Sequence, residues 1–321
     1  MHVLNLTALA IALGCSASAF AQGLPKLAEK AHYKVGFAQT ESNNPWRIAE
    51  TQSMKDVAAK CNWDLVYTDA ASSAAKQVAD VESMIAQKVD LIVLAPREEK
   101  PLIPAVMKAK RAGIPVILID RNVDQKAAAA GRDYVTFIGS DFVDQGRRAA
   151  EWLIKATGGK ATIVELEGTT GSSPANDRKK GFDDAIKKQP GMKIVASQSG
   201  DFARDKGRQV MQTLLQAHPD VTAVYAHNDE MAIGAIAALE AAGKKPGQDV
   251  TVVSIDGTKD ALTAIVAGKM GATVQSSPFF GPVTCDTAKR YVKGEKIAPW
   301  VKVSDKFYDK SNAQASMADG Y

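Results

Sequence analysis

Trp46 and Arg47 are the residues whose types and order first indicate ligand chemistry. They follow Asn43, Asn44 and Pro45. Either asparagine can cap a helix and proline suits the first helical position, so helix initiation explains part of this segment. Capping does not account for an aromatic plate followed by a forked hydrogen-bond donor. We therefore predict that Trp46 and Arg47 contact a ligand, with packing at the helix start as the alternative.

Polar or aromatic side chains also stand at or shortly after the ends of the other apolar runs. They are Asp120, Arg121, Asp177, Arg178, Phe202, Asn228 and Asp256. Arginine and carboxylate groups bind vicinal hydroxyls well, because a sugar hydroxyl both donates and accepts hydrogen bonds. Trp46 and Phe202 would offer flat faces to the C–H side of a pyranose or furanose ring. This combination predicts a carbohydrate site rather than a general apolar pocket.

Each of these residues also has a structural explanation that leaves it out of a site. The alternatives are a strand-end ion pair for Asp120 and Arg121, a solvated charge for Arg178, core packing for Phe202, a helix cap for Asn228 and a turn for Asp256. Asp229 is assigned to helix capping and His227 to burial, and neither is included in the site. Recurrence at the same topological position favours the ligand-binding interpretation of the others.

Sequence signatures of common enzymes are absent. No G-x-G-x-x-G follows the first apolar run, and no G-x-x-x-x-G-K-[ST], H-E-x-x-H or paired C-x-x-C occurs. The histidines that follow residue 21, at 32, 218 and 227, are too widely spaced to predict a metal site. No nucleophile beside a base can be recognised. We expect a binding protein without cofactor or metal, not an enzyme.

The elements that must position these side chains alternate along the chain. The apolar runs interpreted as strands are Val35–Ala38, Leu65–Tyr67, Leu91–Ala95, Ile114–Ile119, Val135–Ile138, Thr162–Leu166, Ile194–Ser197, Ala223–Ala226, Val250–Ile255 and Ala272–Val274. The expected helices are Ile48–Lys60, Ala75–Gln87, Pro101–Ala112, Pro174–Lys188, Lys206–Ala217, Glu230–Ala242 and Lys259–Ala267. Two such sets predict an α/β fold of two doubly wound parallel-sheet lobes. Ligands bind beyond the carboxyl ends of such strands. The polar tail after Val303 is expected to run along the surface.

The first 21 residues have the composition of a secretory signal peptide. Residues 1–21 carry no Lys, Arg, Asp or Glu, and an apolar core from Leu4 to Leu13 precedes Ala19-Phe20-Ala21, which has the form of a cleavage site. We expect cleavage after Ala21 and export of the mature protein. No other stretch approaches the roughly 20 apolar residues that a membrane helix requires.

The charge distribution argues against a nucleic-acid partner, and the cysteine content leaves a possible disulfide undecided. The formal net charge is +4, with Lys and Arg scattered along the chain. Nucleic-acid binding usually shows a concentrated basic face, so no nucleic-acid partner is expected. Cys61 and Cys285 are the cysteines left after cleavage. An oxidising compartment permits a disulfide between them, and two buried free thiols are the open alternative.

The chain resembles the periplasmic sugar-binding proteins of ABC importers, of the ribose/galactose type, from about Tyr33 to about Asp305. The segments that carry the resemblance are Asn43–Trp46, Ile114–Arg121, Gln198–Phe202, Ala226–Ala232 and Ser254–Thr258. Within that family it looks most like the galactofuranose-binding proteins. The features of that subgroup are Trp46-Arg47 and the run Asp177–Phe182.

The resemblance implies two lobes that clamp a monosaccharide and deliver it to a membrane permease. The N-terminal lobe would comprise residues 22–139 and 277–304, and the C-terminal lobe residues 140–276 and 305–321, with crossovers near Ser140, Ser276 and Ser304. The implied ligand residues are Asn44, Trp46, Arg47, Asp120, Arg121, Asp177, Arg178, Phe202, Asn228, Asp256 and Gln275, with Ser276 as the alternative to Gln275. Arg47 and Asp177 follow from the galactofuranose subgroup alone. A monomer is expected.

Other classes of function use the same kind of fold. A transcriptional repressor would need a DNA-binding headpiece, for which residues 22–32 are too short. A chemoreceptor ligand or quorum-signal binder, and an exported sugar-acting enzyme, remain as alternatives to the importer component.

Overall fold

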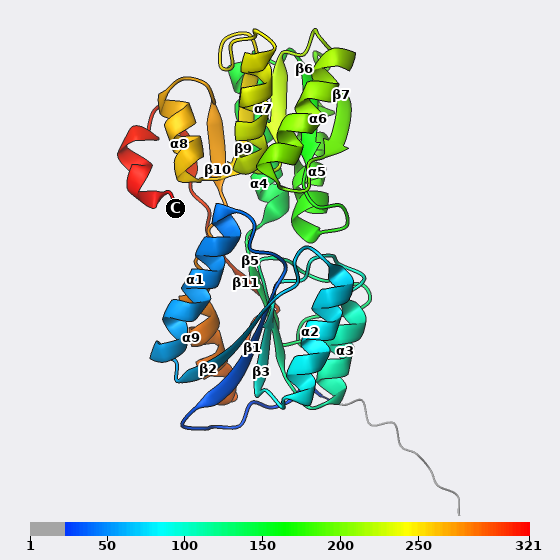
Figure 1. Ribbon diagram of the computed structural model, residues 1–321, viewed down its shortest axis with the longest axis vertical. Coiled ribbons are helices and arrows are strands. Elements are labelled where there is room, and N and C mark those ends of the chain that lie inside the picture. Colours follow the sequence, from blue (N-terminus) through cyan, green and yellow to red (C-terminus); the bar gives the residue numbers. More distant parts are fainter. Residues whose placement is uncertain (1–22) are drawn as a thin grey trace, which may run out of the picture.

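The computed structural model describes residues 23–321, so the predicted signal peptide, residues 1–21, lies outside the described residues. The chain forms two six-stranded sheets with helices on both faces of each (Figure 1). The first sheet has the order β11-β5-β4-β3-β1-β2 and is parallel throughout. Its strands are β1 (Tyr33–Gln39), β2 (Trp63–Asp69), β3 (Leu91–Leu94), β4 (Val116–Ile119), β5 (Thr136–Gly139) and β11 (Trp300–Lys302).

The second sheet has the order β12-β10-β9-β8-β6-β7 and is parallel except for β12 at its edge. Its strands are β6 (Ala161–Glu167), β7 (Met192–Ser199), β8 (Ala223–Ala226), β9 (Thr251–Asp256), β10 (Ala272–Gln275) and β12 (Phe307–Asp309). The expectation of a surface tail after Val303 is wrong for β12, because this strand pairs with β10 and buries Tyr308.

Each sheet with its helices forms one lobe, which confirms the predicted fold class. The first lobe adds α1 (Pro45–Lys60), α2 (Ala74–Ala86), α3 (Ile103–Arg111) and α9 (Gly281–Val292) to the first sheet. The second lobe adds α4 (Phe142–Ala156), α5 (Ser173–Ile186), α6 (Arg204–Ala217), α7 (Asp229–Ala241), α8 (Lys259–Val266) and the 3₁₀ helix η1 (Gln314–Asp319). No helix within residues 23–321 is both long and apolar enough to cross a bilayer.

The sequence analysis did not identify α4 and α9, although both cover a face of their sheet. Small or polar side chains fill much of their buried faces, including Gln145, Gly146 and Ala149 in α4 and Thr284 and Cys285 in α9. The buried face of α9 thus lacks the large apolar residues at helical spacing on which the prediction of a helix depends. The buried face of α4 does carry Phe142 and Leu153, so this helix could have been predicted.

The chain passes between the lobes three times, after β5, after β10 and between β11 and β12. Each crossing contains one of the expected lobe limits, at 139/140, 276/277 and 304/305. The residue-level division of the lobes stays a prediction. All three crossings run through the narrow middle of the molecule (Figure 1).

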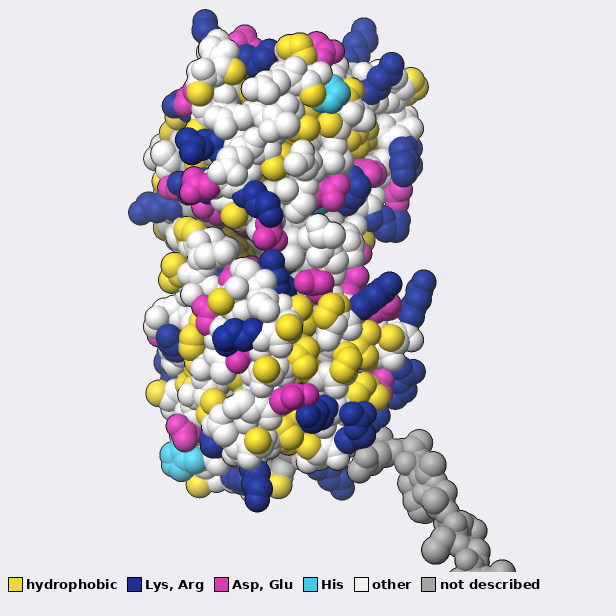
Figure 2. All heavy atoms as spheres, turned by 45° about the vertical axis from the view of Figure 1, so that its right-hand side comes forward, with side chains coloured by type: hydrophobic (Ala, Val, Ile, Leu, Met, Phe, Trp, Pro, Cys, Tyr) yellow, Lys and Arg dark blue, Asp and Glu magenta, His cyan; other side chains and the backbone are white. Residues whose placement is uncertain are grey.

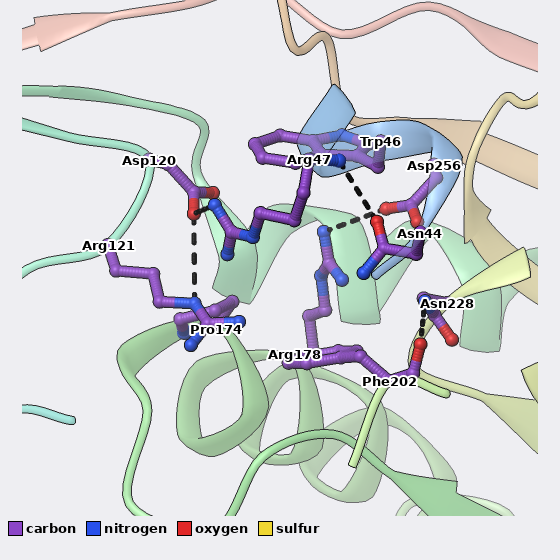
Figure 3. Close-up of a pocket in the computed structure, with 10 residues that line it drawn as sticks. All are labelled: Asn44, Trp46, Arg47, Asp120, Arg121, Pro174, Arg178, Phe202, Asn228 and Asp256. Atoms are coloured by element: carbon purple, nitrogen blue, oxygen red, sulfur yellow. Dashed lines mark hydrogen bonds and ion pairs between the residues drawn. The ribbon is translucent and has the colours of Figure 1, made fainter. Parts of the chain in front are cut away.

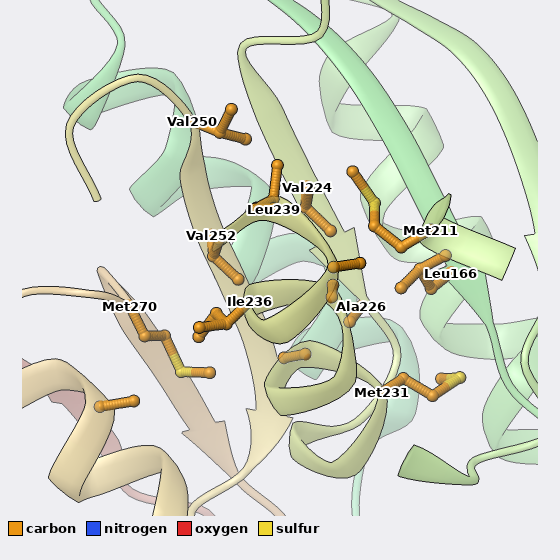
Figure 4. Close-up of a cluster of buried hydrophobic side chains, with 14 of the residues drawn as sticks. Leu166, Met211, Val224, Ala226, Met231, Ile236, Leu239, Val250, Val252 and Met270 are labelled. Carbon is orange, nitrogen blue, oxygen red and sulfur yellow. The ribbon is translucent and has the colours of Figure 1, made fainter. Parts of the chain in front are cut away.

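Separate apolar clusters cover the two faces of each sheet. In the second lobe, Ile236 and Leu239 of α7 pack against Val224 and Val252 of the sheet (Figure 4). The opposite face of the same sheet packs on α4 and α5. On the face of the molecule in Figure 2, the Lys and Arg side chains of the described residues are scattered over both lobes and do not form one basic patch.

Cys61 and Cys285 form a disulfide. Cys61 caps the end of α1 and Cys285 lies in the first half of α9, so the bond joins two helices that pack on the same face of the first sheet. The sequence analysis gave a disulfide and two buried free thiols as equal alternatives, and the structure has the disulfide.

Candidate ligand-binding site

The carboxyl ends of strands from both sheets face one cavity between the lobes (Figure 3). It is lined by Asn44, Trp46, Arg47, Asp120, Arg121, Pro174, Arg178, Phe202, Asn228 and Asp256. The space not filled by protein, including its opening to solvent, is about 330 Å³. Nine of these ten residues are among the eleven predicted from the sequence.

The start of α1 supplies the first wall. Asn44 caps the helix by accepting a hydrogen bond from the Arg47 amide at 2.9 Å, and Pro45 occupies the first helical turn. The Trp46 ring faces Phe202 across the cavity (Figure 3). Its Nε1 donates to the Ser276 carbonyl at 2.7 Å, which ties the ring to a crossing segment. The Arg47 guanidinium lies 4.7 Å from the Trp46 ring centre.

Asp120 and Arg121 close the first lobe's side of the cavity. Asp120 follows β4 in a left-handed conformation, with φ of 56°. Its Oδ2 lies 2.7 Å from Arg47 Nη1 as an ion pair, but neither this oxygen nor Arg121 Nε has a hydrogen-bond partner among residues 23–321. The two atoms also lie 3.7 Å from each other as an ion pair, and both residues line the cavity.

A buried network of ion pairs, on the side away from the cavity, holds Arg47 and Arg121 in place. Glu41 forms ion pairs with Arg47, Arg97 and Arg121. Burial by itself raises the pKa of Glu41, but the three guanidinium groups outweigh it and hold the pKa at about 2. Burial raises the pKa of Glu50 to about 7, although its carboxylate lies 2.7 Å from Arg47 Nη1.

Arg178 from α5 reaches the cavity because α4 and α5 pack backbone to backbone. A Cβ at Gly146 would lie 2.1 Å from the Arg178 carbonyl oxygen, so glycine permits this approach. Arg178 Nε donates to Gln145 Oε1 at 2.9 Å, and Nη1 donates to the His227 carbonyl at 2.6 Å. Nη2 lies 3.5 Å from Asp256 Oδ1. A fixed guanidinium thus faces the space between the lobes.

The second lobe also contributes Phe202, Asn228 and Asp256. Asn228 caps α7 by accepting from the Met231 amide at 3.0 Å, and its Nδ2 donates to the Phe202 carbonyl at 3.0 Å. The capping alternative is therefore correct for Asn228, which also lines the cavity. Burial raises the pKa of Asp256 well above its ordinary value despite Arg178. Arg121 and Arg178 lie 5.5 and 5.8 Å from the Phe202 ring centre.

Asp177 and Gln275 are the predicted residues that do not line this cavity. Asp177 faces a second cavity between the lobes, where it lies near Glu99 and Asp141. Burial and these carboxylates raise its pKa to about 6. Gln275 turns away and accepts a hydrogen bond from the Lys306 amide at 3.1 Å. Ser276, its alternative, offers its backbone to the site through the contact with Trp46.

The sequence analysis did not identify Pro174, nor the buried polar residues that contact the cavity residues from outside the cavity. Pro174 lies in the first turn of α5 and contributes an apolar surface, which has no recognisable ligand chemistry. Glu41, two residues beyond β1, belongs to the same kind of strand-end position as Asp120 and could have been found there. Glu50 and Gln145 sit inside helices, and nothing in their spacing marks them.

Several contacts join the lobes around the cavity. The Glu99 amide donates to the Gly171 carbonyl at 2.9 Å, and the Asn122 amide donates to Ser173 Oγ at 2.8 Å. Arg97 Nη2 lies 3.2 Å from Asp201 Oδ1. The structure therefore has its lobes closed over the cavity.

Two α/β lobes with a cavity between them are typical of the periplasmic binding proteins. The chain belongs to this family, because the family model described as "Periplasmic binding protein domain" matches residues 35–296. The family resemblance recognised in the sequence is confirmed. The chain is 40% identical over 280 residues to the galactofuranose-binding protein YtfQ of Escherichia coli (strain K12), covering 86% of this chain and 87% of that protein.

Two solved structures are similar over nearly their whole length. The periplasmic binding protein component of the arabinose ABC transporter from Shewanella sp. ANA-3, bound to α- and β-L-arabinofuranose, is 39% identical with a TM-score of 0.83, covering 89% of this chain and 95% of that chain. A structure from Mycobacterium smegmatis in complex with β-D-fucofuranose is 41% identical with a TM-score of 0.85, covering 89% and 94%.

Proposed function

We propose that this protein is the solute-binding component of an ABC sugar importer and that it holds one monosaccharide in the cavity between its lobes. The observation that carries the proposal is the convergence of two aromatic rings and five charged side chains, from both lobes, on one cavity. Two of their buried polar atoms, Asp120 Oδ2 and Arg121 Nε, lack hydrogen-bond partners among residues 23–321.

The proposed ligand class is a sugar in its furanose form. The names of three relatives support this choice, since they specify galactofuranose, L-arabinofuranose and D-fucofuranose. The proposed contacts are Asn44, Trp46, Arg47, Asp120, Arg121, Pro174, Arg178, Phe202, Asn228 and Asp256. Asp177 and Gln275 remain outside this set, because their side chains face other parts of the molecule.

The proposed mechanism couples sugar binding to closure. A sugar that touches both walls interacts more strongly with the closed state than with an open one, and this difference in contacts favours closure. Micromolar affinity corresponds to about −8 kcal/mol. Several charge-assisted hydrogen bonds of ~1.5–3 kcal/mol each can supply it after the cost of ordering.

The partner and location follow from the same proposal. A membrane permease would accept the sugar from the closed form, and the periplasm would be the site of action. The disulfide supports an oxidising compartment. A monomer suffices, because one chain supplies both walls. We propose binding without turnover, and hydrolysis of a glycoside by the purified protein would contradict it.

Calorimetric titration with L-arabinose, D-galactose, D-fucose and D-ribose tests the proposal. We expect micromolar or tighter binding of at least one sugar and a matching rise in melting temperature. Labelling the tightest sugar with ¹³C at its anomeric carbon then reports the bound ring form by NMR. A pyranose signal would contradict the furanose assignment, and no binding or stabilisation by any of the four sugars would contradict the sugar-binding role.

A further inference from the structure

Tyr321 reaches the back of the candidate site from the far end of the chain. Its hydroxyl donates to the carbonyl of Asp256 at 3.3 Å. Its ring lies edge-on to Phe279, with 6.0 Å between the ring centres, and packs against the cluster of the first lobe that contains Trp46. One side chain therefore touches a cavity residue of the second lobe, a crossing segment and the core of the first lobe.

The segment that ends in Tyr321 is fixed in place. Lys306 Nζ and the Tyr308 hydroxyl both bind Asp319, at 2.9 and 3.0 Å. A Cβ at Gly320 would lie 2.8 Å from the Cα of Lys259, so the backbone lies directly against the start of α8. Residues 314–321 run beside α8 and end close to the start of α1 (Figure 1).

Asp256 needs such support because its backbone is strained. Its φ is 143°, a conformation that residues other than glycine rarely adopt. Strained residues persist when their surroundings hold them in place, and they cluster at ligand sites. The Asp256 carbonyl accepts from the Ser276 amide at 2.9 Å and from Tyr321, while its carboxylate faces Arg178.

The backbone of Ser276 connects Asp256 to Trp46 on the first lobe's side of the cavity. Its N–H binds the Asp256 carbonyl, and its own carbonyl accepts from Trp46 Nε1 at 2.7 Å. Trp46 and Asp256 are cavity residues of different lobes. The backbone of a single residue in a crossing segment thus joins them, and the Tyr321 hydroxyl also donates to the Asp256 carbonyl.

We propose that Tyr321 is a positioning residue for the sugar site, which holds Asp256 in its strained conformation and thereby links the carboxylate to the Ser276 crossing. The inference rests on the proposed sugar-binding function, since Asp256 is taken to contact the sugar. Burial, with the nearby Asp256 carboxyl, raises the pKa of Tyr321 well above its ordinary value, so the hydroxyl stays protonated and able to donate.

Amide hydrogen exchange without ligand tests the positioning role directly. Tyr321→Phe keeps the ring and removes the donor, so Asp256 should relax and the Ser276 amide should exchange about tenfold faster. Tyr308→Phe is the matched control: it removes the β12 hydroxyl that binds Asp319. Lys306 still holds Asp319 in this variant, so the exchange of Ser276 should change less than about twofold. Unchanged exchange in Tyr321→Phe, or an equal increase in both variants, would overturn the proposal.

A double-mutant cycle separates positioning from general stability. With L-arabinose and D-galactose as probes, Tyr321→Phe should weaken binding about tenfold in the wild-type background and less than about twofold in an Asp256→Asn background. Equal weakening in both backgrounds would mean that Tyr321 does not act through Asp256. If neither sugar binds the wild type, the exchange measurement still decides the positioning role, independently of the proposed function.

Discussion

Asp120 and Asp177 are two aspartates that sequence reasoning placed in one site and that the structure places in different cavities. Asp120 has a buried oxygen without a hydrogen-bond partner in the described chain, whereas Asp177 faces the second cavity. Asp177 is also adjacent to Arg178, and consecutive helical residues point about 100° apart. Here Arg178 lines the central cavity and Asp177 lines the second one.

Exchanging each of these carboxylates for an amide separates the two roles. Asp120→Asn should weaken sugar binding by roughly 10- to 100-fold, because a charge-assisted hydrogen bond of ~1.5–3 kcal/mol is lost. Asp177→Asn should change the dissociation constant less than about twofold. Calorimetry on both variants measures this, and a larger loss in Asp177→Asn would place the site in the second cavity.

Glu41 gives the protein a predictable response to acid. Its pKa in the folded state is about 2, below the ordinary value of 4.5. A depressed carboxyl pKa stabilises the fold above the unfolded value, and this contribution is lost as pH falls from 4.5 towards 2. For Glu41 the amount is about 3 kcal/mol, taking 1.36 kcal/mol per pKa unit.

Urea unfolding between pH 6 and pH 2.5 tests this contribution. Glu41→Gln should be less stable than the wild type at pH 6, and its stability should fall less steeply below pH 4.5. Parallel curves for the two proteins would show that Glu41 is not a source of the acid sensitivity.

At the scale of elements, the Cys61–Cys285 bond makes α1 and α9 one unit. The two helices lie on the same face of the first sheet, and the bond closes a loop with a sequence separation of 224. Trp46 and Arg47 stand at the opposite end of α1 from Cys61. The disulfide should therefore stabilise the lobe without shaping the cavity.

Replacing both cysteines by serine should lower the free energy of unfolding by ~2–4 kcal/mol. Sugar affinity should stay within about twofold of the wild type, because the cavity lining is untouched. A reducing agent should lower the melting temperature of the wild type and leave that of the double variant unchanged. A wild type insensitive to reductant would contradict the stabilising role.

The elements most readily predicted from the sequence were those with large apolar residues at regular spacing. Every predicted strand and helix corresponds to an observed element, because buried parallel strands such as Leu91–Leu94 are apolar along their length. The face of α9 was missed because glycine, alanine, threonine and cysteine fill it, whereas α4 was missed although its buried face includes Phe142 and Leu153. The short strands β11 and β12 carry too few residues to form a pattern.

At the candidate site, strand ends could be predicted but side-chain directions could not. Asp120 and Asn228 follow their strands, Asp256 ends its strand, and all three reach the cavity. Gln275 also ends a strand, but it turns towards Lys306 on a crossing segment that comes 31 residues later in the chain. Such choices depend on tertiary neighbours, which local sequence does not specify.

At the scale of the whole molecule, Arg97 and Asp201 form an ion pair between the lobes. The Asp201 side chain is 30% exposed, so the pair is partly solvated and contributes little to the overall stability. It exists only when the lobes are closed, and losing it should favour opening.

Asp201→Asn should raise the sugar dissociation rate about two- to fivefold, with a smaller effect in 1 M salt, where charges are screened. Asp260→Asn is the matched control, because Asp260 pairs with Arg204 inside the second lobe. Stopped-flow measurement of sugar release compares the two variants. An equal change in both would mean that the inter-lobe pair does not restrain opening.

The three crossings have a consequence for how the protein is made. The first lobe begins with β1, yet its edge strand β11 and its helix α9 lie beyond residue 280. During synthesis, the second lobe's five parallel strands are therefore all available before the first lobe has its last helix, its edge strand or the partner of Cys61. The lobe that starts first is therefore completed only after most of the second lobe has been made, and its covalent link can form only once nearly the whole chain has emerged.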